Sequence, residues 1–407
     1  MSVPYSMEID PDKARELAER GGTLLLLGVP AGTAVGIDHQ MFLSGPKFCG
    51  VKMVPPGPHM LTYYSVASSP GGFSAPNVRW LYLSTSQVTV LRWNGEVELL
   101  DELTDEDEAG RYAQGVRRFD FDAGLAPYNL PAWPVWQEIA GRVTSDLIER
   151  IMPMCGTASV VAEAQLAEDT AAEVQLEEQL RARSASGEDG GPSTSSPVVS
   201  AAAMERLGRC RYTPIPIKVA RPGMTPAEIT AANLDRSAAL ERLVREGYGG
   251  EEGALLGEFQ MAFANFVVGH SLAGYAQWKD TLHLLCTSSQ AANGPSADVL
   301  ASFARILRKQ LQVSLTPGSK TSQGEGMLDA TPFGVPMVEE LLSASFLRPL
   351  LSDWFEDLDG CVTLPQALRS EATKLRDLLA SRLGLEFGIS CLEEDEDDEY
   401  APVVVDM

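Results

Sequence analysis

The chain has 407 residues, 44% of them hydrophobic, and a formal net charge of −24 from 56 acidic and 32 basic side chains. This length predicts two globular domains, and the negative charge argues against direct nucleic-acid binding because phosphate backbones would be repelled. The sequence contains no run of 18 apolar residues and no secretory signal pattern, so we expect a cytoplasmic protein that makes no membrane contact.

The first half combines one helix with many short strands. Asp10 as a cap and Pro11 in the first turn predict a helix that ends at Gly21-Gly22. Short apolar or alternating runs follow, among them the hairpin signal Asn94-Gly95, and predict an antiparallel sandwich or barrel over about 20–102. Helical spacing then returns between 133 and 151, with one face made by Trp136, Ile139, Val143, Leu147 and Ile151.

A change of composition separates this half from the next. Residues 156–205 are first Ala/Glu-rich and then Gly/Ser-rich, which predicts a linker without a core. We expect the β-containing domain over 1–155, an all-α domain over 206–390, and an acidic tail over 391–407.

The second half has helical spacing almost throughout. Thr225, Pro226 and Glu228 match a capping box at the start of one helix. Two later stretches place apolar residues in register and predict core faces. We expect His270 and His283 to lie within these helices as satisfied core or groove residues. The apolar sets are Leu255, Phe259, Phe263 and Phe266, then Leu272, Tyr275, Trp278, Leu282 and Leu285.

Residue types that carry chemistry gather in one stretch, 36–66. It holds Asp38, His39, Cys49 and His59, a set from which a cysteine nucleophile with an oriented base could be built. The glycines and prolines of the same stretch favour turns between strands, and we prefer that interpretation. Across the whole sequence, the six cysteines show no C-x-x-C spacing, so we expect no metal site. No glycine-rich phosphate loop is present either, and we expect no cofactor.

The two halves together resemble the AAR-type pre-mRNA splicing factors. The resemblance runs through "GIDHQMFLSGPKFCGVKMVPPG" in the first half, "GMTPAEIT", "LLGEFQMAFANFVVG" and "YAQWKDTLHLLC" in the second, and "APVVV" in the tail. The turn residues that carry it in the first half are Gly36, Asp38, Gly45, Pro46, Lys47, Phe48, Gly50, Lys52, Pro55, Pro56 and Gly57.

The resemblance implies a β-sandwich-like N-terminal domain, a VHS-like helical C-terminal domain and no enzymatic activity. The implied partner is the large scaffold protein of the U5 snRNP, bound through its RNase H-like and Jab/MPN-like domains. The bound factor would keep the U5 helicase away until the particle matures in the nucleus. We expect the free protein to be a monomer, because nothing in the sequence signals self-association.

The end of the chain combines seven consecutive acids, Glu393 to Glu399, with a short apolar strand pattern. The resemblance implies that this strand adds to the partner between its two domains. Valine favours extended structure, and an open sheet edge can pair with such a peptide. The strand-donor residues would be Tyr400, Ala401, Pro402, Val403, Val404 and Val405.

Three further expectations stay open. Ser184 and Ser186 of the linker are candidate phosphorylation sites. A VHS-like adaptor for peptides in membrane traffic would explain the helical half alone. An enzyme built on Cys49 with His59 or Asp38 is the third interpretation.

Overall fold

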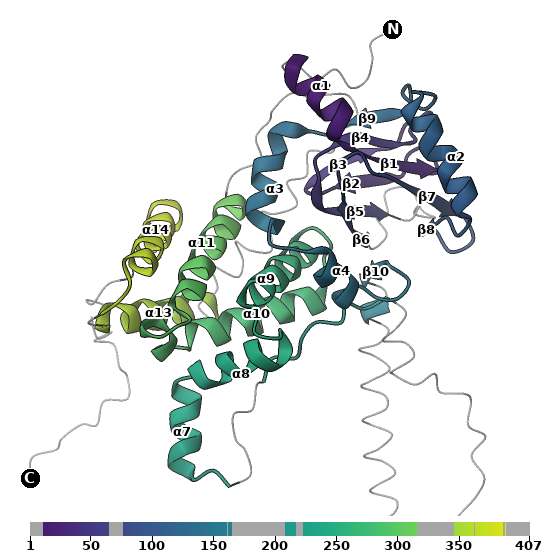
Figure 1. The fold of residues 1–407 in the computed structure, drawn as a ribbon. Helices are drawn as coiled ribbons and strands as arrows, with labels where there is room; N and C mark the ends of the chain where they lie inside the picture. Colours follow the sequence, from purple (N-terminus) through teal and green to yellow (C-terminus); the bar gives the residue numbers. More distant parts are fainter. Residues whose placement is uncertain are drawn as a thin grey trace, which may run out of the picture.

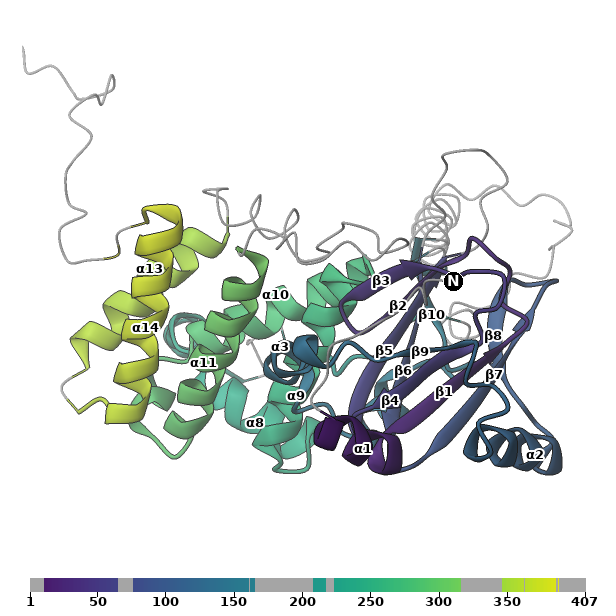
Figure 2. The same ribbon diagram turned by 90° about the horizontal axis from the view of Figure 1, so that it is seen from above.

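The computed structural model describes residues 11–64, 76–160, 162–164, 208–216, 223–315, 346–361, 363–385 and 387. The strand-donor residues 400–405 and the linker serines Ser184 and Ser186 lie outside these ranges. A β-sheet half and a helical half lie side by side, with α3 between them (Figures 1 and 2).

The N-terminal half contains two five-stranded sheets with short helices around them. One sheet has the strand order β8-β7-β1-β4-β9 and the other β10-β6-β5-β2-β3. The elements, in chain order, are α1 (Pro11–Arg20), β1 (Gly22–Leu27), β2 (Ala34–Ile37), β3 (Gln40–Leu43), β4 (Gly50–Val54), β5 (Gly57–Tyr64), β6 (Pro76–Leu83), β7 (Val88–Asn94), β8 (Leu99–Glu102), α2 (Glu106–Arg117), β9 (Leu125–Pro127), η1 (Leu130–Ala132), α3 (Trp133–Ala140), α4 (Ser145–Ile151) and β10 (Ala158–Ser159).

Strand β1 forms the centre of this half because its apolar run is buried on both faces. Leu24 and Leu26 join the cluster shared with the second sheet, and Leu25 joins the cluster beneath α2. A strand covered on both sides has a continuous apolar sequence instead of an alternating one. The run "TLLLL" therefore records a central strand.

The two sheets confirm the expected β-sandwich-like domain, but they are not purely antiparallel. β1 pairs with β7 in parallel over 23–27 and 88–92, and β4 pairs with β9 in parallel. The helical face expected over 133–151 is also interrupted, because α3 ends at Ala140 and Thr144 caps α4 through the backbone N–H of Leu147. Its five core residues are nevertheless all buried.

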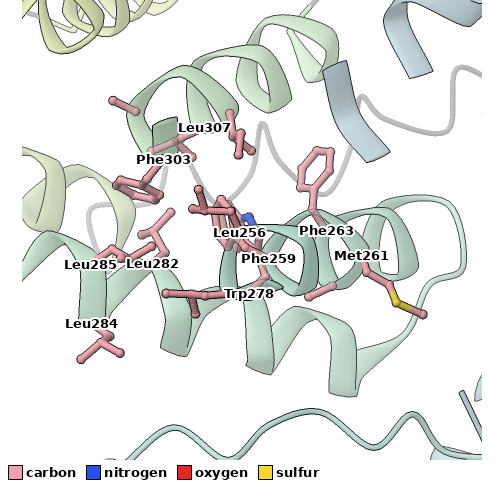
Figure 3. Close-up of a cluster of buried hydrophobic side chains, with 14 of the residues drawn as sticks. Leu256, Phe259, Met261, Phe263, Trp278, Leu282, Leu284, Leu285, Phe303 and Leu307 are labelled. Atoms are coloured by element: carbon pink, nitrogen blue, oxygen red, sulfur yellow. The ribbon is translucent and has the colours of Figure 1, made fainter. Parts of the chain in front are cut away.

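The C-terminal half is helical, as expected. Its helices pack around an aromatic core in which Phe259, Phe263 and Trp278 are fully buried (Figure 3). The helices with defined bounds are α7 (Pro226–Leu234), α8 (Ser237–Gly247), α9 (Glu252–Val267), α10 (Leu272–Cys286), η2 (Gln290–Asn293), α11 (Ala297–Ser314), α13 (Leu347–Gly360) and α14 (Gln366–Leu383).

In this half, the predicted capping box is confirmed, but some residues expected in core faces are exposed. The capping box of Thr225 and Glu228 is present in both directions. Leu272, however, begins α10 and is 66% exposed, although it was expected in register with the buried Trp278. His270 lies in the turn between α9 and α10 and is exposed, so the expectation that it lies within a helix was wrong; His283 lies in α10 and is half-buried.

The two halves share one continuous core. Trp80 of β6 and Asn265 of α9 are both buried, and the Trp80 Nε1–H donates to Asn265 Oδ1 at 2.7 Å. Gln260 of α9 accepts from the backbone N–H of Arg142, just after α3, at 2.8 Å. It also donates to the carbonyl of Glu138, near the end of α3, at 2.9 Å. We call this contact zone the seam.

The buried carboxylate of Glu258 also connects the two halves. Glu258 of α9 is 1% exposed and accepts hydrogen bonds from Arg150 of α4 at 2.8 Å, from the Thr213 N–H at 2.6 Å and from Gln277 of α10 at 3.0 Å. Three separate segments are therefore tied to one charge. A buried carboxylate is tolerated only when it is paired in this way.

Removal of the Glu258 carboxylate should weaken both halves together. We expect Glu258→Ala to lower the free energy of unfolding by about 3 kcal/mol, because it leaves Arg150 and the Thr213 N–H without their acceptor. Urea denaturation followed by Trp fluorescence and by far-UV circular dichroism measures the change. The control Glu246→Ala breaks an exposed ion pair with Arg245 and should change stability by about 0.5 kcal/mol or less. Equal effects of the two substitutions would contradict this account of the seam.

Candidate functional site

The family-motif turns converge on a buried polar cluster formed by Asp38, His59 and Tyr128. Asp38 and His59 have fully buried side chains, with His59 Nδ1 3.0 Å from Asp38 Oδ2. The Tyr128 hydroxyl donates to the same oxygen at 2.5 Å, and the Met60 N–H donates to Asp38 Oδ1 at 3.1 Å. We call these three side chains the hub.

Donor and acceptor chemistry fixes one proton of the hub. The Pro55 carbonyl lies 2.7 Å from His59 Nε2 and can only accept, so Nε2 carries a proton. His59 Nδ1 lies within hydrogen-bond distance of the Asp38 carboxyl group, so both ring nitrogens have a partner. Burial and the neighbouring Asp38 charge raise the pKa of Tyr128 well above its usual value, which keeps its hydroxyl as a donor.

The hub also positions helix α3. The Trp133 ring stacks on His59 at 5.1 Å between ring centres, and Tyr128 meets both rings edge-on. Gly57 has φ +137°, a backbone conformation that favours glycine, and a Cβ there would make a tight contact of 3.3 Å with the Trp133 ring. One turn later, Trp136 Nε1 donates to the Pro58 carbonyl at 2.8 Å. The motif thus sets the angle at which α3 enters the seam.

Cys49 lies away from this cluster. It packs with Leu25 and Leu125 beneath α2, and its Sγ is 3.6 Å from the Phe121 carbonyl. Burial raises the pKa of the Cys49 thiol, which lowers its thiolate fraction. His59 has both ring nitrogens occupied by Asp38 and Pro55, so the structure does not assemble a cysteine–histidine pair from these residues. His39 instead stacks on Trp136, with ring centres 6.3 Å apart.

The remaining motif residues divide into backbone and surface positions. Gly50 has φ +137°, and a Cβ there would lie 2.0 Å from the Leu24 carbonyl, so the β1–β4 pairing requires glycine. Gly36 and Pro55 are buried, Phe48 packs edge-on against Phe42, and Lys52 pairs with Asp122. Among the motif residues, the structure leaves exposed Pro46, Lys47 and Pro56, with Gly45 half-buried beside them.

The described residues on either side of the 165–207 segment contact each other and the start of α10. Glu163 accepts from Ser271 Oγ at 2.7 Å at the start of α10, and the Ser159 N–H donates to the Gly208 carbonyl at 2.9 Å. Glu163 and Cys210 line one small hollow between β6, β10 and α9. Burial raises the pKa of Glu163, against the lowering effect of its Ser271 hydrogen bond, and raises the pKa of Cys210 to about 12.

No group of three or more histidine, cysteine or carboxylate side chains that could hold a metal ion occurs among the residues with described positions. Within that same part of the chain, no helix is both long enough and apolar enough to cross a bilayer.

Sequence reasoning missed Tyr128, the third member of the hub, and Trp133, which stacks on it. They lie 90 and 95 positions after Asp38, so no local spacing connects them to the motif. The available signal was the aromatic and proline-rich stretch "YNLPAWPVW", which directly precedes and opens α3.

Comparison with known proteins gives matches over both halves. The family model for the AAR2 N-terminal domain matches residues 20–153, and that for the AAR2 C-terminal repeat region matches 212–388. A Mus musculus "Protein AAR2 homolog" is 30% identical, covering 99% of this chain and 98% of that protein. The Homo sapiens protein of the same name is 28% identical over the same shares, and a Caenorhabditis elegans homolog is 28% identical over 75% of this chain and 82% of its own length.

Loss of the Asp38 charge should destabilise the fold strongly. We expect Asp38→Asn to cost about 3 kcal/mol in the free energy of unfolding. The two carboxylate oxygens accept from Tyr128 and from the Met60 N–H, and the amide replaces one of these buried acceptors by a donor. Chemical denaturation at neutral pH measures the loss. The control Cys49→Ala changes another side chain of the same 36–66 stretch and should cost about 1 kcal/mol. A loss for Asp38→Asn no larger than that of the control would show that the hub is not a structural lock.

Proposed function

Because the chain belongs to the AAR2 family, we propose that it is a splicing factor that assists assembly of the U5 snRNP without catalysing a reaction. In this proposal it binds the RNase H-like and Jab/MPN-like domains of the large U5 scaffold protein. While bound, it keeps the U5 helicase away, and it leaves when the particle matures. Binding would begin in the cytoplasm, and release would follow entry into the nucleus.

The observation that carries the proposal is the match of both family domains in one chain, at nearly full length. The seam adds physical support, because Trp80–Asn265 and the Glu258 network hold the β-sheet half and the helical half as one body. A rigid body that spans two halves can contact two domains of a partner without loss of its own conformational freedom on binding. Assembly factors that must hold a large scaffold in one arrangement need this property.

The tail, residues 400–405, has the role of a strand donor in this proposal. About five ladder hydrogen bonds at ~1 kcal/mol each and two buried valines at ~2 kcal/mol each supply roughly 9 kcal/mol. Ordering six residues costs roughly 6–12 kcal/mol, so the strand alone is near break-even. Docking of the folded body makes strand addition intramolecular and therefore favourable. The strand acts as a clamp on a complex that is already docked.

Two other functions have less support. An enzyme would need Cys49 near a base. Cys49 packs beneath α2, whereas both ring nitrogens of His59 are hydrogen-bonded within the hub, to Asp38 and to the Pro55 carbonyl. A peptide adaptor built on the helical half would have no need for the seam, which joins that half to the sheets through buried polar groups.

Truncation of the tail should weaken the scaffold complex without preventing it. We expect a variant that ends at Glu399 to bind a scaffold fragment with both partner domains about tenfold more weakly than the full chain, which corresponds to ~1.4 kcal/mol. Isothermal titration calorimetry measures the affinity. A control that ends at Val405 keeps the strand and should bind as the full chain does. Unchanged affinity of the shorter variant at every salt concentration would remove the strand from the proposal.

Phosphorylation of Ser184 and Ser186 is the release signal that we propose. A phosphate on either serine adds negative charge to an acidic chain and should weaken docking. The double variant Ser184→Asp/Ser186→Asp should bind the scaffold fragment about threefold more weakly, and the matched Ser184→Ala/Ser186→Ala should bind as the unmodified chain does. If the aspartate variant binds equally well, release is controlled elsewhere.

A further inference from the structure

A basic surface lies on α11 at the edge of the seam. Arg305 and Lys309, one turn apart on α11, share a single carboxylate, Glu138 of α3, with N–O distances of 3.6 and 3.4 Å. Arg142, just after α3, lies 3.5 Å from Ser302 on the same face of α11. On the other side, Arg308 and Lys374 share Glu371 of α14. Figures 1 and 2 show α14, α11 and α3 side by side in this order.

We call this surface the α11 ridge. It consists of Arg142, Arg305, Arg308, Lys309 and Lys374. Four of its five positive charges pair with two carboxylates, Glu138 and Glu371. These seven side chains together have a net charge of +3, in a chain whose net charge is −24. Arg305 and Lys374 keep 59% and 52% of their side chains exposed, whereas Lys309 and Arg308 keep 26% and 17%. The ridge is therefore open to a ligand mainly at Arg305 and Lys374.

Three successive ring contacts connect the end of the described chain to α11. Phe387 packs on Phe355, whose ring neighbour Trp354 packs on Phe303 of α11, with successive ring centres 5.2, 5.4 and 5.8 Å apart. Phe303 precedes Arg305 by two residues. The acidic run Glu393–Glu399 begins six residues after Phe387, a span of at most about 20 Å when extended. The acids can therefore reach the ridge from their own attachment point.

We propose that the acidic run Glu393–Glu399 binds the α11 ridge of the same chain. Seven negative charges meet a surface of net +3 at the high effective concentration that a short tether provides. The docked run touches α3 and α11 together, and so covers the seam. This inference concerns the protein without any partner, and it holds or fails independently of the U5 scaffold.

Other occupants fit less well. An RNA or DNA strand would meet the ridge, but the remainder of a chain with net charge −24 would repel it. A separate acidic protein would have to displace a ligand that is covalently attached next to the site. The effective concentration of the tethered acids therefore favours their binding over that of either competitor.

A synthetic peptide of residues 389–407 tests the proposal by fluorescence anisotropy. We expect the peptide to bind a chain that ends at Leu392 and to bind the full chain at least fivefold more weakly, because the attached tail already occupies the ridge. Binding should weaken further between about 50 and 300 mM salt as the charges are screened.

Charge-neutral variants locate the site. In the chain that ends at Leu392, the triple variant Arg142→Gln/Arg305→Gln/Lys309→Gln should reduce peptide affinity at least fivefold. The matched control Arg111→Gln/Arg117→Gln/Arg118→Gln removes the same charge from exposed residues in and next to α2 and should reduce it less than twofold. Thermal melts confirm that each variant is folded.

The proposal is overturned by absence of peptide binding, by equal losses in the two triple variants, or by equal binding to the full and shortened chains. Tight binding of a single-stranded oligonucleotide that the ridge variant abolishes would identify nucleic acid as the occupant instead.

Discussion

The buried pair of Asp38 and His59 is the constraint on which the arrangement of this protein depends. Two ionisable side chains with no solvent exposure are tolerated only when each finds a partner, and these two find each other, Tyr128 and the Pro55 carbonyl. The partners come from the β2–β3 turn, from β5 and from the segment before α3. Since Trp133 stacks on His59, the same requirement fixes the start of α3. The direction of α3 then decides where α9 and α11 can pack.

The seam turns two family domains into one body. Its contacts are polar as well as apolar: Trp80 with Asn265, Gln260 with the backbone near the end of α3, and Glu258 with Arg150. Buried hydrogen bonds specify one arrangement more strictly than apolar packing alone, because any slip leaves a donor or acceptor without a partner. A partner would therefore meet a fixed surface across both halves.

Local chemistry explains what the sequence could predict. The capping box at Thr225, the apolar run of β1 and the aromatic face of α9 each depend on residues within a few positions of one another, and all three are present. The parallel pairing of β1 with β7 joins residues more than 60 positions apart, and nothing local distinguishes it from an antiparallel neighbour. The sequence predicts two of the three residues of the hub as candidate functional residues, Asp38 and His59, but their partner Tyr128 lies 90 residues after Asp38. Without that partner, the pair suggests a catalytic set with Cys49, an interpretation less favoured than turns between strands.

The charge pattern of the chain gives the tail two competing uses. In the proposed function, free acids would repel one another and extend the segment before Tyr400, which would lengthen the reach of the proposed strand. Acids docked on the α11 ridge would give up that reach, because the tether is then used along the surface of its own chain. The strand could still pair with a sheet edge brought close to the seam, but not with a distant one. A scaffold that first contacts the seam would therefore displace the acids and be the first surface within range of the released strand, so docking of the body and clamping by the tail become consecutive steps of one event.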